Sequence, residues 1–259
     1  MVRRETDDIP RLNVSICGKL AIEAGTVVVL ERDFPARQGR RLWSYLVLER
    51  RRIASRDELG EAIWGDEPPD EWDTALSAIA SRLRSTLKPV PGIEVVNDSG
   101  GYRLRLPSHV FIDFERARYG LHLAETALAQ GDARAALSEA RVALEIAARG
   151  FLPGEGLPWV ELRRRQLRDT QIHAGECLAE AELRRNQPLR AEREAEELLI
   201  VDPLNEAAYR IRMRAAVAMG NRAGLLRAIT QCRTVLASHA GMTPSAETEQ
   251  LFQDLGRDV

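Results

Sequence analysis

The sequence predicts a mainly α-helical protein with a small β portion. Ala, Leu, Arg and Glu dominate the composition, and these residues favour helices. Apolar residues recur every three or four positions through most of the chain, which is the helical period. Strict alternation, the period of a strand, is confined to short stretches before residue 31 and around residues 93–106. With 259 residues, the chain is long enough for two ordinary domains.

Residues 11–31 predict a three-stranded meander. Apolar side chains alternate from Leu12 to Ile16 and resume at Leu20 and Val27, with glycine-containing turns between them. Residues 1–10 (MVRRETDDIP) lack the apolar core of a signal peptide and are expected to form a disordered tail.

Two helices are expected next. Residues 41–51 place Leu42 and Leu46 on one face, flanked by Tyr45 or Leu48. Ile53 fits a short strand. Ser55 then begins S-R-D-E, a capping box that opens a helix through residue 63, ended by Trp64 and Gly65.

The stretch 71–88 (EWDTALSAIASRLRSTLK) predicts an amphipathic helix. Its core face is formed by four residues at helical spacing: Leu76, Ala80, Leu83 and Leu87. Asp73 or Thr74 is expected to cap its start, and Pro89 stops it. The opposite face carries small or hydrogen-bonding residues and arginine, which suits insertion into a DNA major groove. The alternative is an ordinary core helix with a solvated polar face.

Residues 93–96 and 102–106 predict a hairpin around NDSGG. The order is therefore meander, helix, helix, turn, helix, hairpin. Two helices joined by a tight connection form a helix-turn-helix, and the hairpin after them forms a wing. This order, rather than any single helix, favours DNA binding.

Residues 11–106 resemble the winged-helix effector domain of OmpR/PhoB-type response regulators. Four motifs in order carry the resemblance: SRD with Leu59, IWG at 63–65, SRLR at 81–84 and GYRL at 101–104. The resemblance implies a third helix in the major groove, aromatic residues near phosphates and wing residues in the minor groove. The implied DNA-binding residues are Trp64, Thr74, Ser77, Ile79, Ser81, Arg82, Arg84, Tyr102 and Arg103.

Several of these residues have a structural alternative. Trp64 and Tyr102 are equally compatible with core aromatic residues whose polar tips reach the surface. Arg84 can pair with an acid, and Ile79 can be half-buried instead of meeting a thymine methyl. Asp98 places an acid at the wing tip, where a nearby phosphate is unfavourable.

The second half predicts a stack of helices with a break, FLPGEGLPW, at 151–159. The expected helices span 111–131, 133–149, 159–185, 188–201, 205–219, 222–239 (closed by Gly241) and 244–255. Small-residue patterns such as GDARAALSEA recur at a spacing near ~34 residues, which is typical of tetratricopeptide-like repeats. Such a stack offers a groove for a peptide, a helix or a second copy of itself.

Residues 110–255 resemble the bacterial transcriptional activator domain that follows the winged helix in Streptomyces antibiotic regulatory proteins (SARP). The residues that carry this are Asp113, Phe114, GD at 131–132, AAL at 135–137, PLNE at 203–206, Arg210, MRA at 213–215, Gly220 and GMTPS at 241–245. The resemblance implies a transcriptional regulator that binds promoter repeats in double-stranded DNA, usually as a dimer, and contacts RNA polymerase holoenzyme.

Composition and motifs argue against other function classes. Residues 1–107 hold 17 basic and 17 acidic residues, so DNA binding must come from local placement of charge. The three cysteines and four histidines have no metal or catalytic spacing, and no nucleophile elbow or glycine-rich phosphate loop occurs. We therefore expect no enzyme, metal or cofactor, no membrane span, and a cytoplasmic protein with reduced cysteines.

The sequence-based interpretation is a two-domain regulator that reads DNA with Arg82. The alternative is a protein–protein interaction module that uses the helical stack and has lost DNA binding. A positive stripe of Arg82, Arg103 and Arg105, joined by Arg40 or Arg41, would favour DNA binding. Neutralisation of that stripe by Asp70, Glu71 and Asp98 would favour the alternative.

Overall fold

The computed structural model describes residues 11–98 and 100–257, which form two compact units. Residues up to Arg116 together with Arg149–Leu167 form the first, here called the winged-helix unit. Ala117–Ala148 and the residues from Arg168 onward form the second, here called the helical unit. The predicted tail at residues 1–10 lies outside the described residues. The segment 149–167 thus belongs to the winged-helix unit although it follows the hairpin by more than forty positions.

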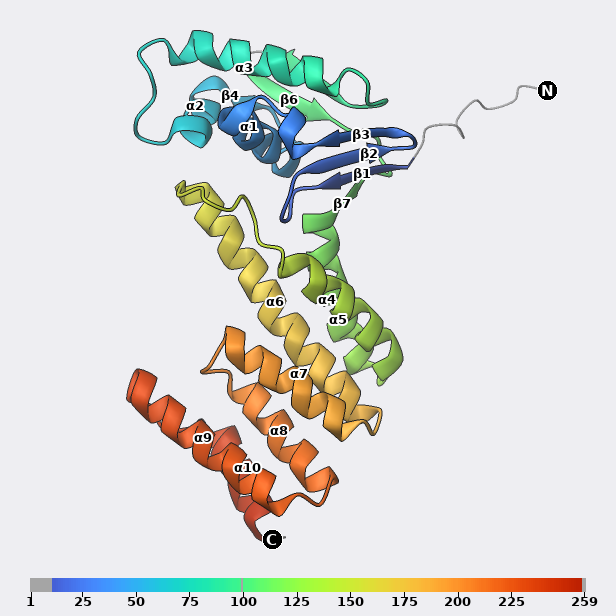
Figure 1. Cartoon of the computed structure of the whole chain (residues 1–259), viewed down its shortest axis with the longest axis vertical. Coiled ribbons are helices and arrows are strands. Elements are labelled where there is room, and N and C mark those ends of the chain that lie inside the picture. Colours follow the sequence, from blue (N-terminus) through green and yellow to red (C-terminus); the bar gives the residue numbers. More distant parts are fainter. Residues whose placement is uncertain (1–10, 99, 258–259) are drawn as a thin grey trace, which may run out of the picture. The chain divides into compact units, whose positions relative to one another are not determined.

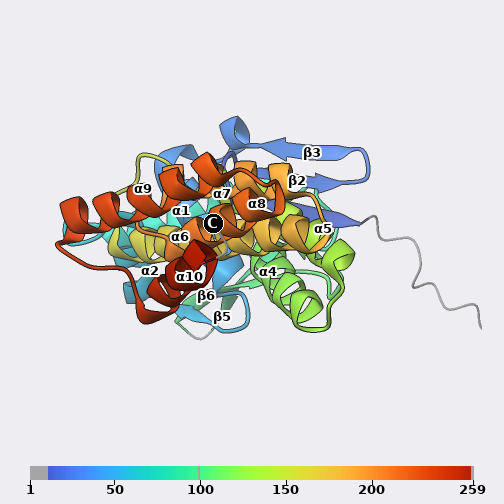
Figure 2. The same cartoon turned by 90° about the horizontal axis from the view of Figure 1, so that it is seen from below.

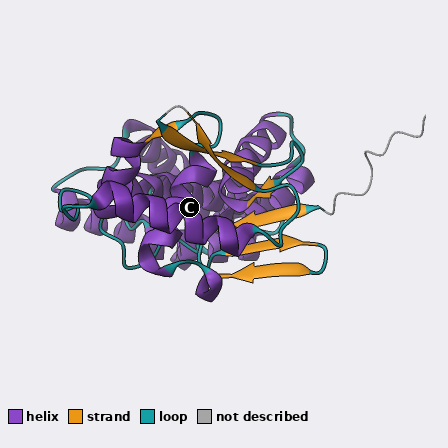
Figure 3. Cartoon of the chain, turned by 90° about the horizontal axis from the view of Figure 1, so that it is seen from above, coloured by secondary structure: helices purple, strands orange, loops and turns teal. Residues whose placement is uncertain are grey.

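The predicted meander is confirmed and gains a fourth strand. β1 (Leu12–Ser15), β2 (Ala21–Ala24) and β3 (Val27–Leu30) are antiparallel, and they are drawn as orange arrows in Figure 3. β7 (Phe111–Ile112) pairs parallel to β1 and completes the order β3-β2-β1-β7. Sequence reasoning missed β7 because a two-residue strand has too little alternation to be recognised.

Helices α1 (Ala36–Leu48) and α2 (Arg56–Trp64) follow, after a short 3₁₀ turn η1 (Glu31–Asp33). Leu42 and Leu46 are buried as predicted. α1 begins earlier than expected because its first turn is polar and carries no apolar period. The predicted capping box is confirmed: the Ser55 hydroxyl accepts the Glu58 amide at 3.2 Å, and the Glu58 carboxylate accepts the Ser55 amide.

α3 (Trp72–Leu87) has the predicted core face, and all four of its residues are buried. The predicted cap is wrong. Glu71 occupies the N-cap position without a side-chain hydrogen bond, and the helix is already formed at Asp73 and Thr74. The Asp73 carboxylate instead accepts a hydrogen bond from Arg56, so an ion pair takes the place of the expected cap.

The wing is a three-stranded sheet in the order β4-β6-β5. Its strands are β4 (Ala54–Ser55), β5 (Glu94–Asp98) and β6 (Gly101–Arg105). Ile53 was expected in the first of these, but it precedes β4 and is exposed. The tip residue 99 lies outside the described residues. At Gly101 the strands approach so closely that a Cβ would lie 2.1 Å from the Ala54 carbonyl oxygen, so only glycine fits there.

The second half is helical, as predicted. Its helices are α4 (Asp113–Ala129), α5 (Ala133–Ala147), α6 (Pro158–Arg184), α7 (Pro188–Val201), α8 (Glu206–Ala218), α9 (Arg222–Ala240) and α10 (Ala246–Arg257). α7, α8 and α9 pack side by side in sequence order (Figures 1 and 2). Gly241 ends α9, as predicted, and has a left-handed backbone. Asp132, Asn205 and Asn221 cap the helices that follow them through their side chains.

Small side chains form the contacts between these helices. One hydrophobic cluster joins α6, α7 and α8. Its buried residues are Ala179, Ala191, Ala195, Leu198, Ala208, Ile211 and Ala215. Alanine at such contacts lets helix axes approach closely, which is the packing expected for a tetratricopeptide-like stack. The three cysteines are free and buried, and no helix among the described residues is long and apolar enough to cross a membrane. No metal-ligand cluster occurs in that part of the chain either.

Candidate nucleic-acid interface

The outer face of α3 is a narrow exposed stripe. Its residues share the spacing of one helix face, i, i+4, i+7, i+8 and i+11: Thr74, Ala78, Ser81, Arg82 and Ser85. All but Arg82 are small, so a neighbouring surface can approach the helix backbone closely. Arg82 makes no ion pair or hydrogen bond with any described residue, and its donors are therefore available to a ligand.

Two predicted residues lie at the edges of this stripe. The Ser77 hydroxyl accepts from Arg56 Nη2 at 2.8 Å and donates to the Asp73 carbonyl at 3.1 Å, so its hydrogen-bonding capacity is already used. Ile79 is half-buried. Ala78 and Ser85 are exposed but were absent from the predicted set. Their spacing from Thr74 and Ser81 is the signal that would have identified them.

Tyr102 lies between two arginines at the side of α3. Its side chain is buried, with 2% exposure, and the guanidinium carbons of Arg56 and Arg84 lie 5.6 and 5.3 Å from its ring centroid. Arg56 also donates to the Tyr102 hydroxyl at 3.3 Å. Arg84 Nε donates to the Val95 carbonyl at 2.8 Å and thereby ties α3 to β5. These contacts favour the structural alternative for Tyr102, and Arg84 pairs with a carbonyl rather than an acid.

Arg56 was missed as a site residue although it belongs to the SRD motif. It joins α2 to α3 through hydrogen bonds to the Asp73 carboxylate, the Asp73 carbonyl at 2.8 Å and Ser77. The Asp73 carboxylate raises the pKa of Arg56. An arginine directly after a helix cap is exposed in most proteins, so local sequence did not indicate this role.

Trp64 and Arg103 are the remaining predicted site residues. Trp64 is the half-buried last residue of α2 and is followed by Gly65 in a backbone conformation with φ of 68°. Arg103 lies 3.7 Å from the Asp98 carboxylate, and Arg105 lies 3.3 Å from Glu94. The first pair is partly exposed and the second is exposed. Surface pairs of this kind are worth ~0–1 kcal/mol, so a phosphate can compete with the carboxylate.

The predicted basic stripe is only partly present. Arg41 does not join it, because its side chain is buried and bound to Glu155. Arg40 lies 3.8 Å from Glu31. A groove between α3 and β5 nevertheless carries several polar groups that can bind phosphate, and it is lined by Ser81, Arg84, Ser85, Leu87, Lys88, Ile93, Glu94 and Val95. The cationic character of the interface is therefore concentrated near Arg82 and Lys88.

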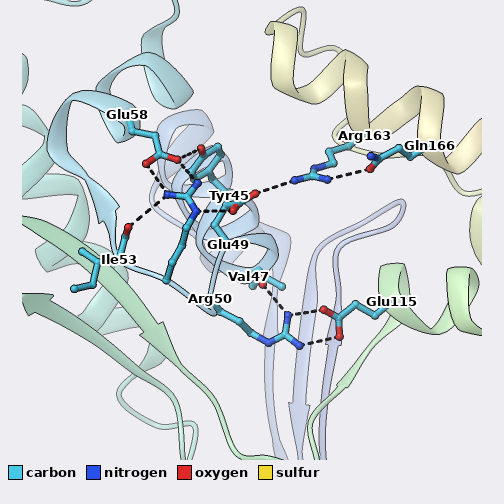
Figure 4. A network of polar contacts seen from close by, with 10 residues as sticks. Tyr45, Val47, Glu49, Arg50, Ile53, Glu58, Glu115, Arg163 and Gln166 are labelled. Atoms are coloured by element: carbon cyan, nitrogen blue, oxygen red, sulfur yellow. Dashed lines mark hydrogen bonds and ion pairs between the residues drawn. The ribbon is translucent and has the colours of Figure 1, made fainter.

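A polar network behind the helix-turn-helix holds α1 in place (Figure 4). The Tyr45 hydroxyl donates to Glu58, and Arg52 binds the same carboxylate and lowers the pKa of Glu58 to about 2. At the same C-terminal end of α1, Arg163 on α6 donates to Glu49 at 2.8 Å (Figure 4). The partner of Arg163 thus lies 114 positions away in the sequence.

A helix-turn-helix with a wing, followed by a helical stack, defines a transcriptional regulator of the winged-helix class. Comparison with family models agrees: residues 36–104 match "Transcriptional regulatory protein, C terminal" and residues 112–255 match "Bacterial transcriptional activator domain". The second match covers more than half of the chain. The protein belongs to the bacterial transcriptional activator domain family, with the SARP arrangement of a winged helix followed by that domain.

Two curated relatives are larger proteins. The chain is 31% identical over 216 residues to regulatory protein AfsR of Streptomyces coelicolor. The matched region covers 83% of this chain and 22% of that protein. The chain is 29% identical over 223 residues to AfsR of Streptomyces griseus, covering 85% of this chain and again 22% of the relative. The chain thus matches about a fifth of the length of these relatives.

A solved structure shares the fold. The structure of Mycobacterium tuberculosis EmbR in complex with a low-affinity phosphopeptide superposes with a TM-score of 0.82 at 23% identity. The match covers 96% of this chain and 66% of that chain. At this identity the likeness shows the fold alone.

Proposed function

We propose that the chain binds promoter DNA in a sequence-specific manner and regulates transcription. The observation that carries this proposal is the narrow exposed face of α3, on which Arg82 has no partner among the described residues. An α-helix enters the major groove when its outer face is slim, and arginine is the residue that most often reads guanine through O6 and N7.

The other site residues divide into contacts and supports. Thr74 and Ser81 are exposed donors for base edges or phosphates, whereas the Ser85 hydroxyl donates to the Ser81 carbonyl at 3.1 Å and is left as an acceptor. We assign Trp64 and Arg103 to contacts with the DNA backbone. Ile79 stays a candidate for a thymine methyl at the edge of the groove. Arg84, Tyr102 and Ser77 act chiefly as supports, because their polar groups are already bonded within the unit.

The proposal extends to partners. Family membership supports an activator that binds promoter repeats as a dimer and contacts RNA polymerase holoenzyme through the winged helix, the helical domain or both. We assign the boundaries 11–106 to DNA reading and 110–255 to protein contacts. Within this proposal the chain is a cytoplasmic regulator and not an enzyme.

Selection of bound duplexes from a random DNA pool at low salt tests the proposal. Recovery of a repeated motif is the expected result, and the spacing of its halves gives the geometry of a dimer. Recovery of no motif would contradict DNA reading and would favour the interaction module.

A further inference from the structure

The C-terminus of α2 is capped by side chains from elsewhere in the winged-helix unit. The last carbonyl groups of a helix have no partner within the helix. The Ala62 carbonyl accepts a hydrogen bond from Trp159 Nε1 at 3.0 Å, across 97 positions of sequence. The next carbonyl, that of Ile63, accepts from Arg41 Nη1. Two successive end carbonyls of the first helix of the helix-turn-helix thus receive donors from α6 and α1.

Glu155 fixes the arginine that makes the second of these bonds. Its carboxylate has 5% exposure and accepts from Arg41 Nε at 2.7 Å and from Arg37 Nε at 2.8 Å. Burial opposes ionisation of this carboxylate, but the two guanidinium groups outweigh burial and lower the pKa of Glu155. A buried carboxylate between two arginines is held in one position by both charge and hydrogen-bond geometry.

Leu157 and the Trp159 ring complete the contact. A Cβ on Gly65 would lie 3.0 Å from Leu157 Cδ2, so Leu157 packs directly against the turn that follows α2. The Trp159 ring stands edge-on to Tyr45, with centroids 5.1 Å apart, and to Phe151 at 5.7 Å. Its orientation is therefore set by packing as well as by its hydrogen bond.

These contacts surround one residue of the proposed DNA interface. Trp64 lies between Ile63, which Arg41 binds, and Gly65, which Leu157 contacts. We infer that residues 155–159 are positioning residues for DNA binding: they hold the end of α2 and so aim Trp64 at the DNA backbone. This inference rests on the proposed function. It places part of the DNA-reading apparatus inside the segment that matches the activator-domain model, beyond the boundary at residue 106.

Trp159→Phe in the full chain tests the inference, because it removes the N–H donor and keeps an aromatic ring. Glu155→Gln, which removes the charge at constant shape, is the second variant. The control is Glu145→Gln on α5, because Glu145 is exposed and has no partner among the described residues. Without DNA, we expect the Gly65 amide, which donates to Glu61 at 2.8 Å, to exchange hydrogen at least about tenfold faster in both variants. The Val90 amide, which donates to Leu87 at the end of α3, is expected to exchange as in the wild type.

On the selected duplex, both variants are expected to bind about tenfold more weakly. The slope of log affinity against log salt is expected to stay as in the wild type, because Trp64 is neutral and its contact with a phosphate releases no counterion. Adding Trp159→Phe to Trp64→Ala should cost nothing further, since both act on the same contact.

If the Gly65 amide exchanged hydrogen in both variants at the wild-type rate, the claim that Trp159 and Glu155 stabilise the end of α2 would be overturned. Faster exchange of the Gly65 amide with unchanged DNA affinity would overturn the positioning role. A wild-type chain that binds no duplex would instead refute the proposed function, and the exchange measurement would still decide the cap.

Discussion

The guanidinium of Arg84 lies 5.3 Å from the ring centroid of Tyr102, and its Nε donates to the Val95 carbonyl on β5. Arg84 thus supports the wing from α3. We predict that Arg84→Ala lowers the free energy of unfolding by about 1–3 kcal/mol, because a cation–π contact and a charge-assisted hydrogen bond are lost. Urea unfolding measures this change. Full stability combined with lost DNA binding would show instead that Arg84 contacts DNA directly.

Asp113 joins the start of α4 to β1. Its carboxylate, with 1% exposure, accepts the backbone amides of Ile16 at 2.9 Å, Cys17 at 3.0 Å and Phe114 at 2.8 Å. Asp113→Ala leaves these buried donors without an acceptor, and we expect a loss of about 3 kcal/mol or more in unfolding free energy. Asp113→Asn, which keeps one acceptor oxygen, should lose less. Equal stability of Asp113→Ala and the wild type in urea would contradict this role.

The lowered pKa of Glu58 predicts how the free energy of unfolding responds to acid. Its pKa is lowered from 4.5 to about 2, chiefly by Arg52. A carboxylate with a depressed folded-state pKa contributes stability above its unfolded pKa, and this contribution disappears as the pH falls through the folded pKa. The stability difference between wild type and Glu58→Gln should therefore be constant at neutral pH and shrink between pH 4.5 and 2. Urea unfolding across this range measures it, and a difference that does not vary with pH would count against the network in Figure 4.

The cysteines are expected to be unreactive in the native chain. Burial raises the pKa of Cys177 to about 12 and of Cys232 to about 11, and it also raises the pKa of Cys17. Since the thiolate is the reactive species, a disulfide-exchange reagent at pH 8 should label all three residues only after unfolding. Rapid native labelling of any one of them would show that the structure around it opens locally.

The local sequence was enough to predict those features that depend only on neighbouring residues. The core face of α3, the Ser55 capping box and the glycine end of α9 all depend on residues within a few positions of one another. The SARP resemblance also identified both halves of the chain, because its motifs are distributed over nearly all of it.

The features that the sequence did not predict depend on hydrogen bonds between residues far apart in the chain. Asp113 was recognised as a motif residue, but its partners Ile16 and Cys17 lie almost a hundred positions away. The arginine at position 41 was expected in an exposed basic stripe, because nothing nearby in sequence reveals Glu155 as its partner. Thr74, Ser81 and Arg82 were predicted on the exposed face of α3. Ser77 was also predicted there, but its hydroxyl is bound by Arg56, which the local sequence does not reveal.

Binding of the selected duplex to the wild type, to Arg82→Ala and to Arg227→Ala tests the central claim most directly. Arg227 is an exposed arginine on α9, without a partner among the described residues, and serves as the control. Fluorescence anisotropy at several salt concentrations is the measurement. We predict that Arg82→Ala weakens binding by about 1–3 kcal/mol and reduces discrimination against a scrambled duplex, whereas Arg227→Ala binds like the wild type. Equal affinity and discrimination in all three proteins would contradict DNA reading by α3.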